Sequence, residues 1–185
     1  MIKEVLNEAK AAMEKSTEVL NNELGRIRTG RASTSLVEKL RVDYYGTPTP
    51  LQQLALISVP EAQLITIRPF DPGALKDIER AILQSDLGIT PNNDGKLIRL
   101  QVPALTEERR KELAKQVHAR VEEARVAIRN LRRDALEDLR EMEKEKMISE
   151  DDFYSAKEDL QKLTDEYVKK AGEIGQAKEA EIMSI

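Results

Sequence analysis

The chain has 185 residues, which is long enough for one sizeable domain or two small ones. Charged residues make up 35% of it and the net charge is −4, but apolar residues are frequent and periodic, so the composition argues against a disordered chain. Because the chain has no cysteine, a disulfide framework, a thiolate zinc site and a cysteine nucleophile are all excluded.

We expect no targeting or membrane segment. Acidic residues interrupt Met1 to Lys15 and no small-residue cleavage site follows, which argues against a secretory signal and a transit peptide. No apolar run approaches the length that crosses a bilayer. These features predict a cytoplasmic protein that has no membrane among its partners.

Three segments carry apolar residues with a helical period. The first covers about Ile2 to Thr29, and Gly30 is placed to end it in a left-handed conformation. The second covers about Glu107 to Met147, with Thr106 as the expected N-cap, and the third runs from its expected cap Ser149 to about Ile182. Each helix has one apolar stripe, so the three are expected to pack together as a bundle.

The segment between the first two helices has a different composition, with nearly all the prolines and most of the glycines. A short amphipathic helix is expected over Gly73–Gln84. Runs of β-branched residues predict four short strands, at Leu40–Tyr45, Leu54–Val59, Leu64–Arg68 and Lys96–Val102. The predicted class is therefore α+β: residues 1–30 and 105–185 form a long three-helix bundle, and residues 31–104 form a small inserted β/α/β domain.

The chain crosses between these two predicted domains twice. One crossing passes through Gly30 and Arg31, and the other through Pro103 and Ala104. Glycine widens the backbone's conformational range, whereas proline fixes φ. We predict that the two neighbouring connections form a hinge.

The residues offer little support for catalysis. His118 is the only histidine, and it falls on the polar side of the second helix with no cysteine or second histidine to share a metal. No glycine-rich loop opens a helix to hold a nucleotide. We therefore expect a protein that is not an enzyme and that uses neither a metal nor a cofactor.

The most informative segment is Arg125 to Arg133, RVAIRNLRR, which has four arginines and no acid. On a helical wheel Arg125, Arg129, Arg132 and Arg133 lie at about 0°, 40°, −20° and 80°, so they share one face. The planar fork of arginine binds phosphates bidentately. No aromatic residue lies near the arginines, which favours the backbone of folded RNA over splayed single-stranded bases as their partner.

Two other interpretations of this face stay open at this point. The arginines could form an ordinary solvated face in which Glu122 pairs with Arg125 and Asp134 with Arg129. Alternatively, the protein could be a coiled-coil adaptor whose helices recruit partner helices, with the arginines serving only solubility. The adaptor predicts self-association through the apolar stripes, whereas a bundle that closes on itself predicts a monomer.

Two further residues extend the prediction. Leu136 lies at about 20° on the same wheel, so it is either an ordinary exposed leucine or an apolar contact with a partner. Arg110, with Arg109 and Lys111 beside it, opens the second helix where the helix dipole disfavours cations. We therefore add Arg110 to the candidate RNA-binding residues.

The chain resembles the bacterial ribosome recycling factor family along its whole length and in order. The similar stretches are RTGRAS, VDYYGTPTPLQQLA, SDLGITPNNDG, LTEERRKEL, RVAIRNLRRDALEDL and KLTDEYVKK. The resemblance implies an L-shaped protein with the bundle as its long arm. It also implies a translation factor that, with elongation factor G and GTP, dissociates the post-termination ribosome and releases it from messenger RNA.

The resemblance further implies what each part binds. The bundle is similar to the part that binds large-subunit rRNA, chiefly through the arginine of the RNxRRDA stretch, which is Arg132 here, flanked by Arg129 and Arg133. The small domain is similar to the part that faces the small subunit and is pushed by elongation factor G. One departure is visible, because Thr34 stands where many members have proline, two residues after the alanine of TGRA. Threonine restricts the backbone less than proline, so a less stiff connection is expected at this point.

Overall fold

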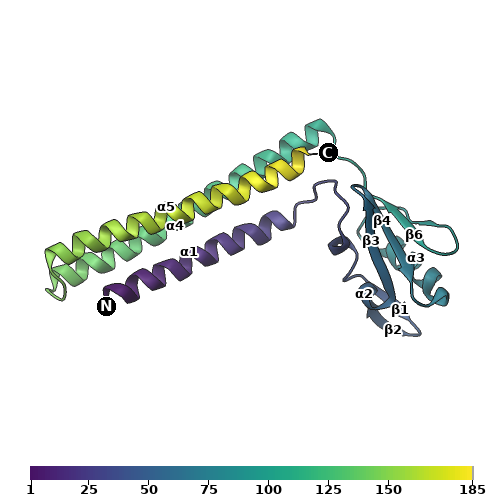
Figure 1. The fold of residues 1–185 in the computed structure, drawn as a ribbon, viewed down its shortest axis with the longest axis horizontal. Coiled ribbons are helices and arrows are strands. Elements are labelled where there is room, and N and C mark those ends of the chain that lie inside the picture. The colour runs from purple at the N-terminus through teal and green to yellow at the C-terminus, as the bar shows by residue number, and fades with distance from the viewer. Residues whose placement is uncertain (185) are drawn as a thin grey trace. The chain divides into compact units, whose positions relative to one another are not determined.

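The computed structural model describes residues 1–184 and divides the chain into two compact units. The helical unit comprises Met1–Arg28 and Glu107–Ser184, and the small unit comprises Thr29–Thr106. The architecture is α+β, as the sequence predicts (Figure 1).

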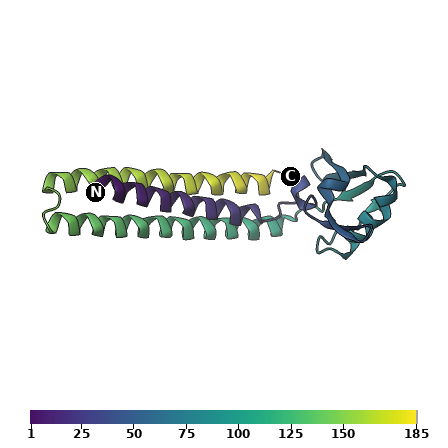
Figure 2. The same ribbon diagram turned by 90° about the horizontal axis from the view of Figure 1, so that it is seen from below.

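Three helices form the helical unit, namely α1 (Ile2–Gly25), α4 (Glu107–Lys144) and α5 (Glu150–Met183). They lie side by side along their lengths, and each packs against the other two (Figure 2). The predicted apolar stripe of α4 is its buried face: Leu113, Val117, Val121, Ala124, Ile128, Ala135 and Leu139. The predicted three-helix bundle is confirmed.

Helix α1 ends earlier than the sequence predicts, at Gly25 and not near Thr29. Glycine weakens a helix, and the N–H of Arg26 turns back to the carbonyls of Glu23 and Leu24 in a tightened last turn. Gly30 is therefore not the residue that ends this helix. It does have a positive φ of 76°, but it lies in the small unit.

The turn between α4 and α5 shows why both helices stop and start where they do. Lys146 adopts a positive φ of 61°, so α4 ends at Lys144, three residues before the predicted Met147. Ser149 caps α5 as predicted, since its Oγ accepts a hydrogen bond from the N–H of Asp152 at 3.0 Å. The Asp152 carboxylate accepts in return from the N–H of Ser149, which completes a capping box.

Two antiparallel sheets and short helices form the small unit. Strands β1 (Arg41–Tyr44) and β2 (Thr47–Pro50) pair with each other. The second sheet has the order β3-β4-β6-β5, built from β3 (Ala55–Glu61), β4 (Leu64–Pro69), β5 (Asn92–Asn93) and β6 (Ile98–Gln101). The helical elements are the 3₁₀ turns Thr34–Leu36 and Pro72–Ala74, α2 (Leu51–Leu54) and α3 (Leu75–Gln84). Helix α3 buries Leu75, Ile78 and Ile82 in one core with Ile65, Ile67, Ile98 and Leu100 of the sheet.

Strand β2 was not predicted, because its sequence TPTP reads as turn chemistry. Pro48 pairs with Asp43 and Pro50 with Arg41 in a sheet of only two strands. A strand in such a sheet has a free edge, where the missing proline N–H breaks no ladder. Strand β5 was missed for a related reason, since its two residues, Asn92 and Asn93, belong to the sequence PNNDG, which is typical of a turn.

The two connecting segments lie against each other inside the small unit. A Cβ on Gly30 would lie 3.2 Å from the Leu105 nitrogen and 3.3 Å from the Pro103 oxygen. The N–H of Ala32 donates to the Ala62 carbonyl at 2.7 Å, and the N–H of Val102 donates to the Gln63 carbonyl at 2.8 Å. Both segments are thus fixed to the same turn between β3 and β4.

Thr34 occupies a position that accepts proline. It is the first residue of a 3₁₀ turn whose N-cap, Ser33, is extended with φ −144° and ψ 141°. Proline suits the first helical position and requires an extended residue before it. We expect Thr34→Pro to raise the free energy of unfolding of the small unit by about 0.4–1 kcal/mol, because it restricts the unfolded chain.

Urea unfolding of the full-length protein, followed through NMR amide signals of the small unit, measures this change. Thr34→Ala is the control, because it removes the threonine side chain without restricting φ. A Thr34→Pro variant that is no more stable than Thr34→Ala would contradict the prediction.

Asp94 organises the turn between β5 and β6. Its Oδ1 accepts hydrogen bonds from the N–H groups of Lys96 and Leu97, each at 2.9 Å, and its Oδ2 lies 2.7 Å from Nη1 of Arg99. The hydrogen bond from Leu97, then that from Lys96 and then Arg99, lower the pKa of Asp94 from 3.8 to about 2.

The small unit should lose stability as the pH falls through this window. The unfolded carboxyl gains its proton near pH 3.8, while the folded one resists protonation down to about pH 2, so the contribution is complete above pH 3.8 and is lost on acidification to about pH 2. Asp94→Asn should lower stability at pH 7 and flatten this part of the pH dependence. Urea midpoints of small-unit amides between pH 2 and 6 measure both effects, and equal slopes for the two proteins would refute the assignment.

Candidate nucleic-acid interface

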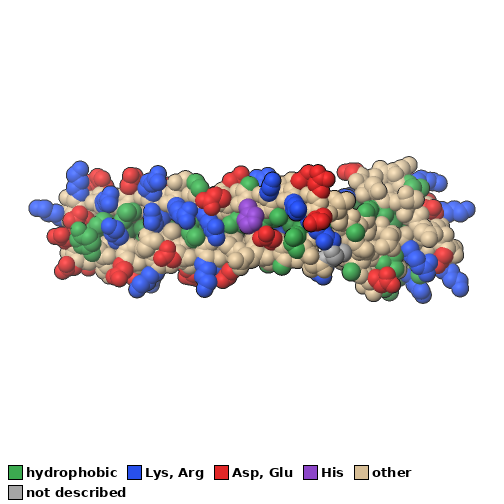
Figure 3. Space-filling view, turned by 90° about the horizontal axis from the view of Figure 1, so that it is seen from above, with side chains coloured by type: hydrophobic (Ala, Val, Ile, Leu, Met, Phe, Trp, Pro, Cys, Tyr) green, Lys and Arg blue, Asp and Glu red, His purple; other side chains and the backbone are tan. Residues whose placement is uncertain are grey.

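Arg125, Arg129, Arg132 and Arg133, called the arginine face below, lie on α4 beside α5. They span nine residues, or about 12 Å of helix. In the space-filling view, cationic side chains gather over α4 and α5 on the face that shows the single histidine (Figure 3). The arginine face has four cations and one carboxylate paired with them, Glu122, in a chain whose net charge is −4.

Two of the four arginines share one carboxylate. Glu122 Oε2 lies 4.0 Å from Nη1 of Arg125, and its Oε1 lies 3.7 Å from Nη1 of Arg129. The distances are long and the Glu122 side chain is 60% exposed, so these ion pairs contribute little to stability. The predicted contact with Glu122 is present, but among residues 1–184 Asp134 forms no ion pair with Arg129.

Arg132 reaches across to α5 and meets a neutral group. Its Nη1 donates to Oε1 of Gln161 at 2.8 Å, and Nε2 of Gln161 donates to Oδ1 of Asp165 at 2.9 Å. The Arg132 side chain is half-buried, and its Nε has no solvent access and no hydrogen-bond partner among the described residues. Its stem is therefore held by packing while its outer nitrogens face the surface.

Arg125 also lies against α5, over a glycine. A Cβ at Gly172 would lie 2.6 Å from Nη2 of Arg125, closer than real side chains approach. One turn further along α5, a Cβ at Gly175 would collide with Cγ2 of Val121. The two glycines of α5 therefore allow α4 to approach closely and leave room for the Arg125 guanidinium.

Arg133 and Leu136 complete this side of α4. Arg133 is exposed, and within residues 1–184 no carboxylate lies within 4 Å of it. Leu136 is not the exposed leucine or partner contact that the wheel suggests, since it is half-buried and packs against the cluster around Leu139 and Phe153. Residues near the start of α5, including Phe153, cover this side of α4. Leu136 therefore belongs to the core of the bundle.

Two other predicted residues lie apart from the arginine face. Arg110 is half-buried near the start of α4, about 22 Å along the helix from Arg125. His118 is 70% exposed, and its Nε2 lies 3.4 Å from Oε1 of Glu179 on α5. The structure therefore brings four of the five candidate arginines together and leaves Arg110 separate.

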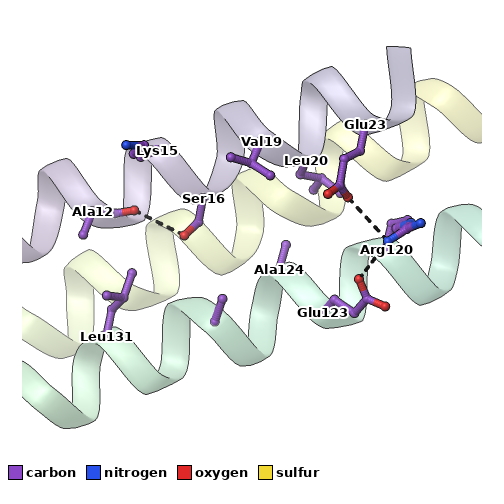
Figure 4. A pocket seen from close by; sticks show the side chains of 11 residues that line it. Ala12, Lys15, Ser16, Val19, Leu20, Glu23, Arg120, Glu123, Ala124 and Leu131 are labelled. Carbon is purple, nitrogen blue, oxygen red and sulfur yellow. Dashed lines mark hydrogen bonds and ion pairs between the residues drawn. The ribbon is translucent and has the colours of Figure 1, made fainter. Parts of the chain in front are cut away.

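A groove of about 420 Å³ lies between α1 and α4, on a side of α4 away from the arginine face (Figure 4). Alanine, valine and leucine side chains line most of it. Its one arginine, Arg120, faces Glu123 at 3.3 Å and Glu23 at 3.9 Å. The groove is lined by two cations, Lys15 and Arg120, and by two carboxylates, Glu23 and Glu123, so these charges balance and the groove carries no positive excess to attract a phosphate.

Other kinds of site find no support in the described residues. Across residues 1–184 no cluster of histidine, aspartate and glutamate side chains could hold a metal ion. None of the helices in that range is long and apolar enough to cross a membrane. The arginine face is the feature whose chemistry suits a polyanion, because guanidinium groups can donate to phosphate oxygens.

Gln161, Asp165 and Gly172 were missed by the sequence analysis, which considered α4 alone. The antiparallel register of α4 and α5 brings them beside the arginines. One signal was available, since residues 161, 165, 168 and 172 are spaced four, three and four apart along one edge of α5. Because those positions flank the buried stripe of α5, they border whichever helix packs beside it.

The family model and the sequence relatives point to the same family. The family model described as ribosome recycling factor matches residues 20–183. The chain is 58% identical to the ribosome-recycling factor of Roseiflexus castenholzii and 56% identical to that of Listeria innocua, over the full length of all three chains.

Two similar solved structures are of ribosome recycling factors as well. A solution structure of a ribosome recycling factor is 45% identical to the chain, with a TM-score of 0.75, and covers 100% of this chain and 98% of the other. A Thermus thermophilus ribosome recycling factor, placed with Escherichia coli elongation factor G on the post-termination complex, is 44% identical with a TM-score of 0.63 and 99% coverage of both chains.

Proposed function

Because the chain belongs to the ribosome recycling factor family, we propose that it dissociates the post-termination ribosome and releases it from messenger RNA. It would do so together with elongation factor G and GTP. The relative solved with elongation factor G on the post-termination complex supports these partners. GTP hydrolysis would belong to elongation factor G, so the chain itself acts as a translation factor and not as an enzyme.

The arginine face is the part that we assign to large-subunit rRNA. The observation that carries this assignment is that four arginines share one surface while Arg132 and Arg133 have no carboxylate within 4 Å among residues 1–184. An ordinary solvated face would pair its cations with neighbouring acids. Guanidinium groups left without a counter-charge are available for phosphate oxygens.

The small unit would face the small subunit and receive the push of elongation factor G. We assign the joint to Gly30–Arg31 and Pro103–Ala104, in keeping with a bundle of residues 1–30 and 105–185 and an inserted domain of residues 31–104. The contact of Gly30 with Pro103 and Leu105 supports this, because it holds the two connections next to each other. A force on the small unit would then pass through one narrow point.

Binding of isolated large subunits should depend on Arg132 and on salt. If four arginines contact phosphates, the log of the binding constant should fall with the log of the salt concentration with a slope of roughly −3. Arg132→Ala should weaken binding by about 1–3 kcal/mol if its contact is bidentate. Co-sedimentation with large subunits over a range of salt concentrations measures both quantities.

Arg120→Ala is the matched control, since it removes an arginine from the same helix where two glutamates already surround it. It should leave affinity for the large subunit unchanged. Native affinity and native subunit dissociation by Arg132→Ala would disprove the assignment of this face to rRNA.

A further inference from the structure

Helix α5 contacts the arginine face at two points that have the geometry of supports. Gln161 accepts a hydrogen bond from Arg132, and Gly172 lies beneath the guanidinium of Arg125. We propose that Gln161, with Asp165 behind it, and Gly172 are positioning residues that hold Arg132 and Arg125 in the orientation that binds phosphate. This inference rests on the proposed function and names residues that α4 alone does not supply.

The Gln161 amide suits this task because it is neutral. Its oxygen accepts from Nη1 of Arg132, while Asp165 accepts from the NH₂ group of Gln161 and so turns the amide oxygen toward Arg132. A carboxylate at this position would also hold the arginine, but it would compete with a phosphate for the same charge. A glutamine holds the Arg132 guanidinium in place and leaves its full positive charge for the ligand.

Gly172 acts through space and not through a hydrogen bond. The Arg125 side chain is 34% exposed and lies where a Cβ of residue 172 would be, 2.6 Å from Nη2. Glycine is a poor residue in the interior of a 34-residue helix, so its presence favours a role in admitting a neighbour. Here the neighbour is a guanidinium on the proposed binding surface.

Substitutions at Gln161 distinguish a role in positioning Arg132 from a role in the stability of the bundle. Gln161→Leu should weaken binding of isolated large subunits by about threefold to fivefold, the range for one exposed charged contact. Gln161→Glu should reduce the magnitude of the log–log salt slope by about one, because Arg132 then has a permanent counter-charge. In the Arg132→Ala background neither change should have a further effect on affinity.

Gln116 provides the matched control. It is an exposed glutamine on α4, about 180° around the helix from Arg125. Gln116→Leu and Gln116→Glu should leave both the affinity and the salt slope at their native values.

Gly172→Ala tests the second support. Alanine favours the helix, so the melting temperature should stay equal or rise, while affinity for large subunits should fall about threefold because Arg125 is displaced. Gly25→Ala is the control, because a Cβ there meets no atom of the described chain within 4 Å and no arginine is moved. Loss of affinity without loss of stability is an outcome that a purely structural role for Gly172 does not produce.

The failures can be told apart. Native affinity and native salt slope for the Gln161 and Gly172 variants, with binding still weakened by Arg132→Ala, would overturn the positioning role and leave the proposed function standing. Native affinity of Arg132→Ala itself would overturn the proposed function and this inference with it.

Discussion

The close packing of α4 against α5 is the constraint on which the proposed binding surface depends. Val121 of α4 lies where a side chain of residue 175 would be, so the two backbones approach more closely than larger residues would allow. The buried stripe of α4 keeps a period near 3.6 from Leu113 to Leu139, and the line of contact therefore continues along the bundle. Side chains that flank this line on α4, including Arg125 and Arg132, stay within reach of α5.

That packing explains why the arginine face is not simply a row of mobile cations. A long arginine on an isolated helix loses considerable side-chain entropy when it binds a ligand. Packing of the Arg132 stem and the contact with Gln161 restrict this side chain before any ligand arrives. Such preorganisation lowers the entropic cost of binding, so a surface with few contacts can still bind specifically.

Much of the helical unit could be predicted from the sequence, because helical periodicity is a local signal. The Ser149 cap and the buried stripe of α4 follow directly from residue spacing. The end of α1 was predicted four residues too late, because Gly30 and not Gly25 was expected to end the helix. Strand β2 was missed because the free edge that tolerates Pro48 and Pro50 exists only once β1 pairs with it.

The same division applies to the candidate site. The four arginines could be placed on one face from their spacing alone. Leu136 was predicted to be exposed, and Gln161 and Gly172 were missed, because all three depend on how α5 packs against α4. A helical wheel describes directions around one axis and contains no information about the neighbour. Residues that act across a helix–helix contact are therefore the part of a site that a single sequence hides best.

The charge arrangement also fits a factor that must leave its partner after each round. Glu122 lies between Arg125 and Arg129, and a phosphate approaching either arginine must compete with that carboxylate. Arg132 and Arg133 face no such competitor within the described residues, so they would make the first and strongest contacts. The net charge of the chain is −4, so a local positive face would also orient the approach of a polyanion. Under the proposed function, four unopposed arginines would bind RNA more tightly, but they would also slow release from the ribosome.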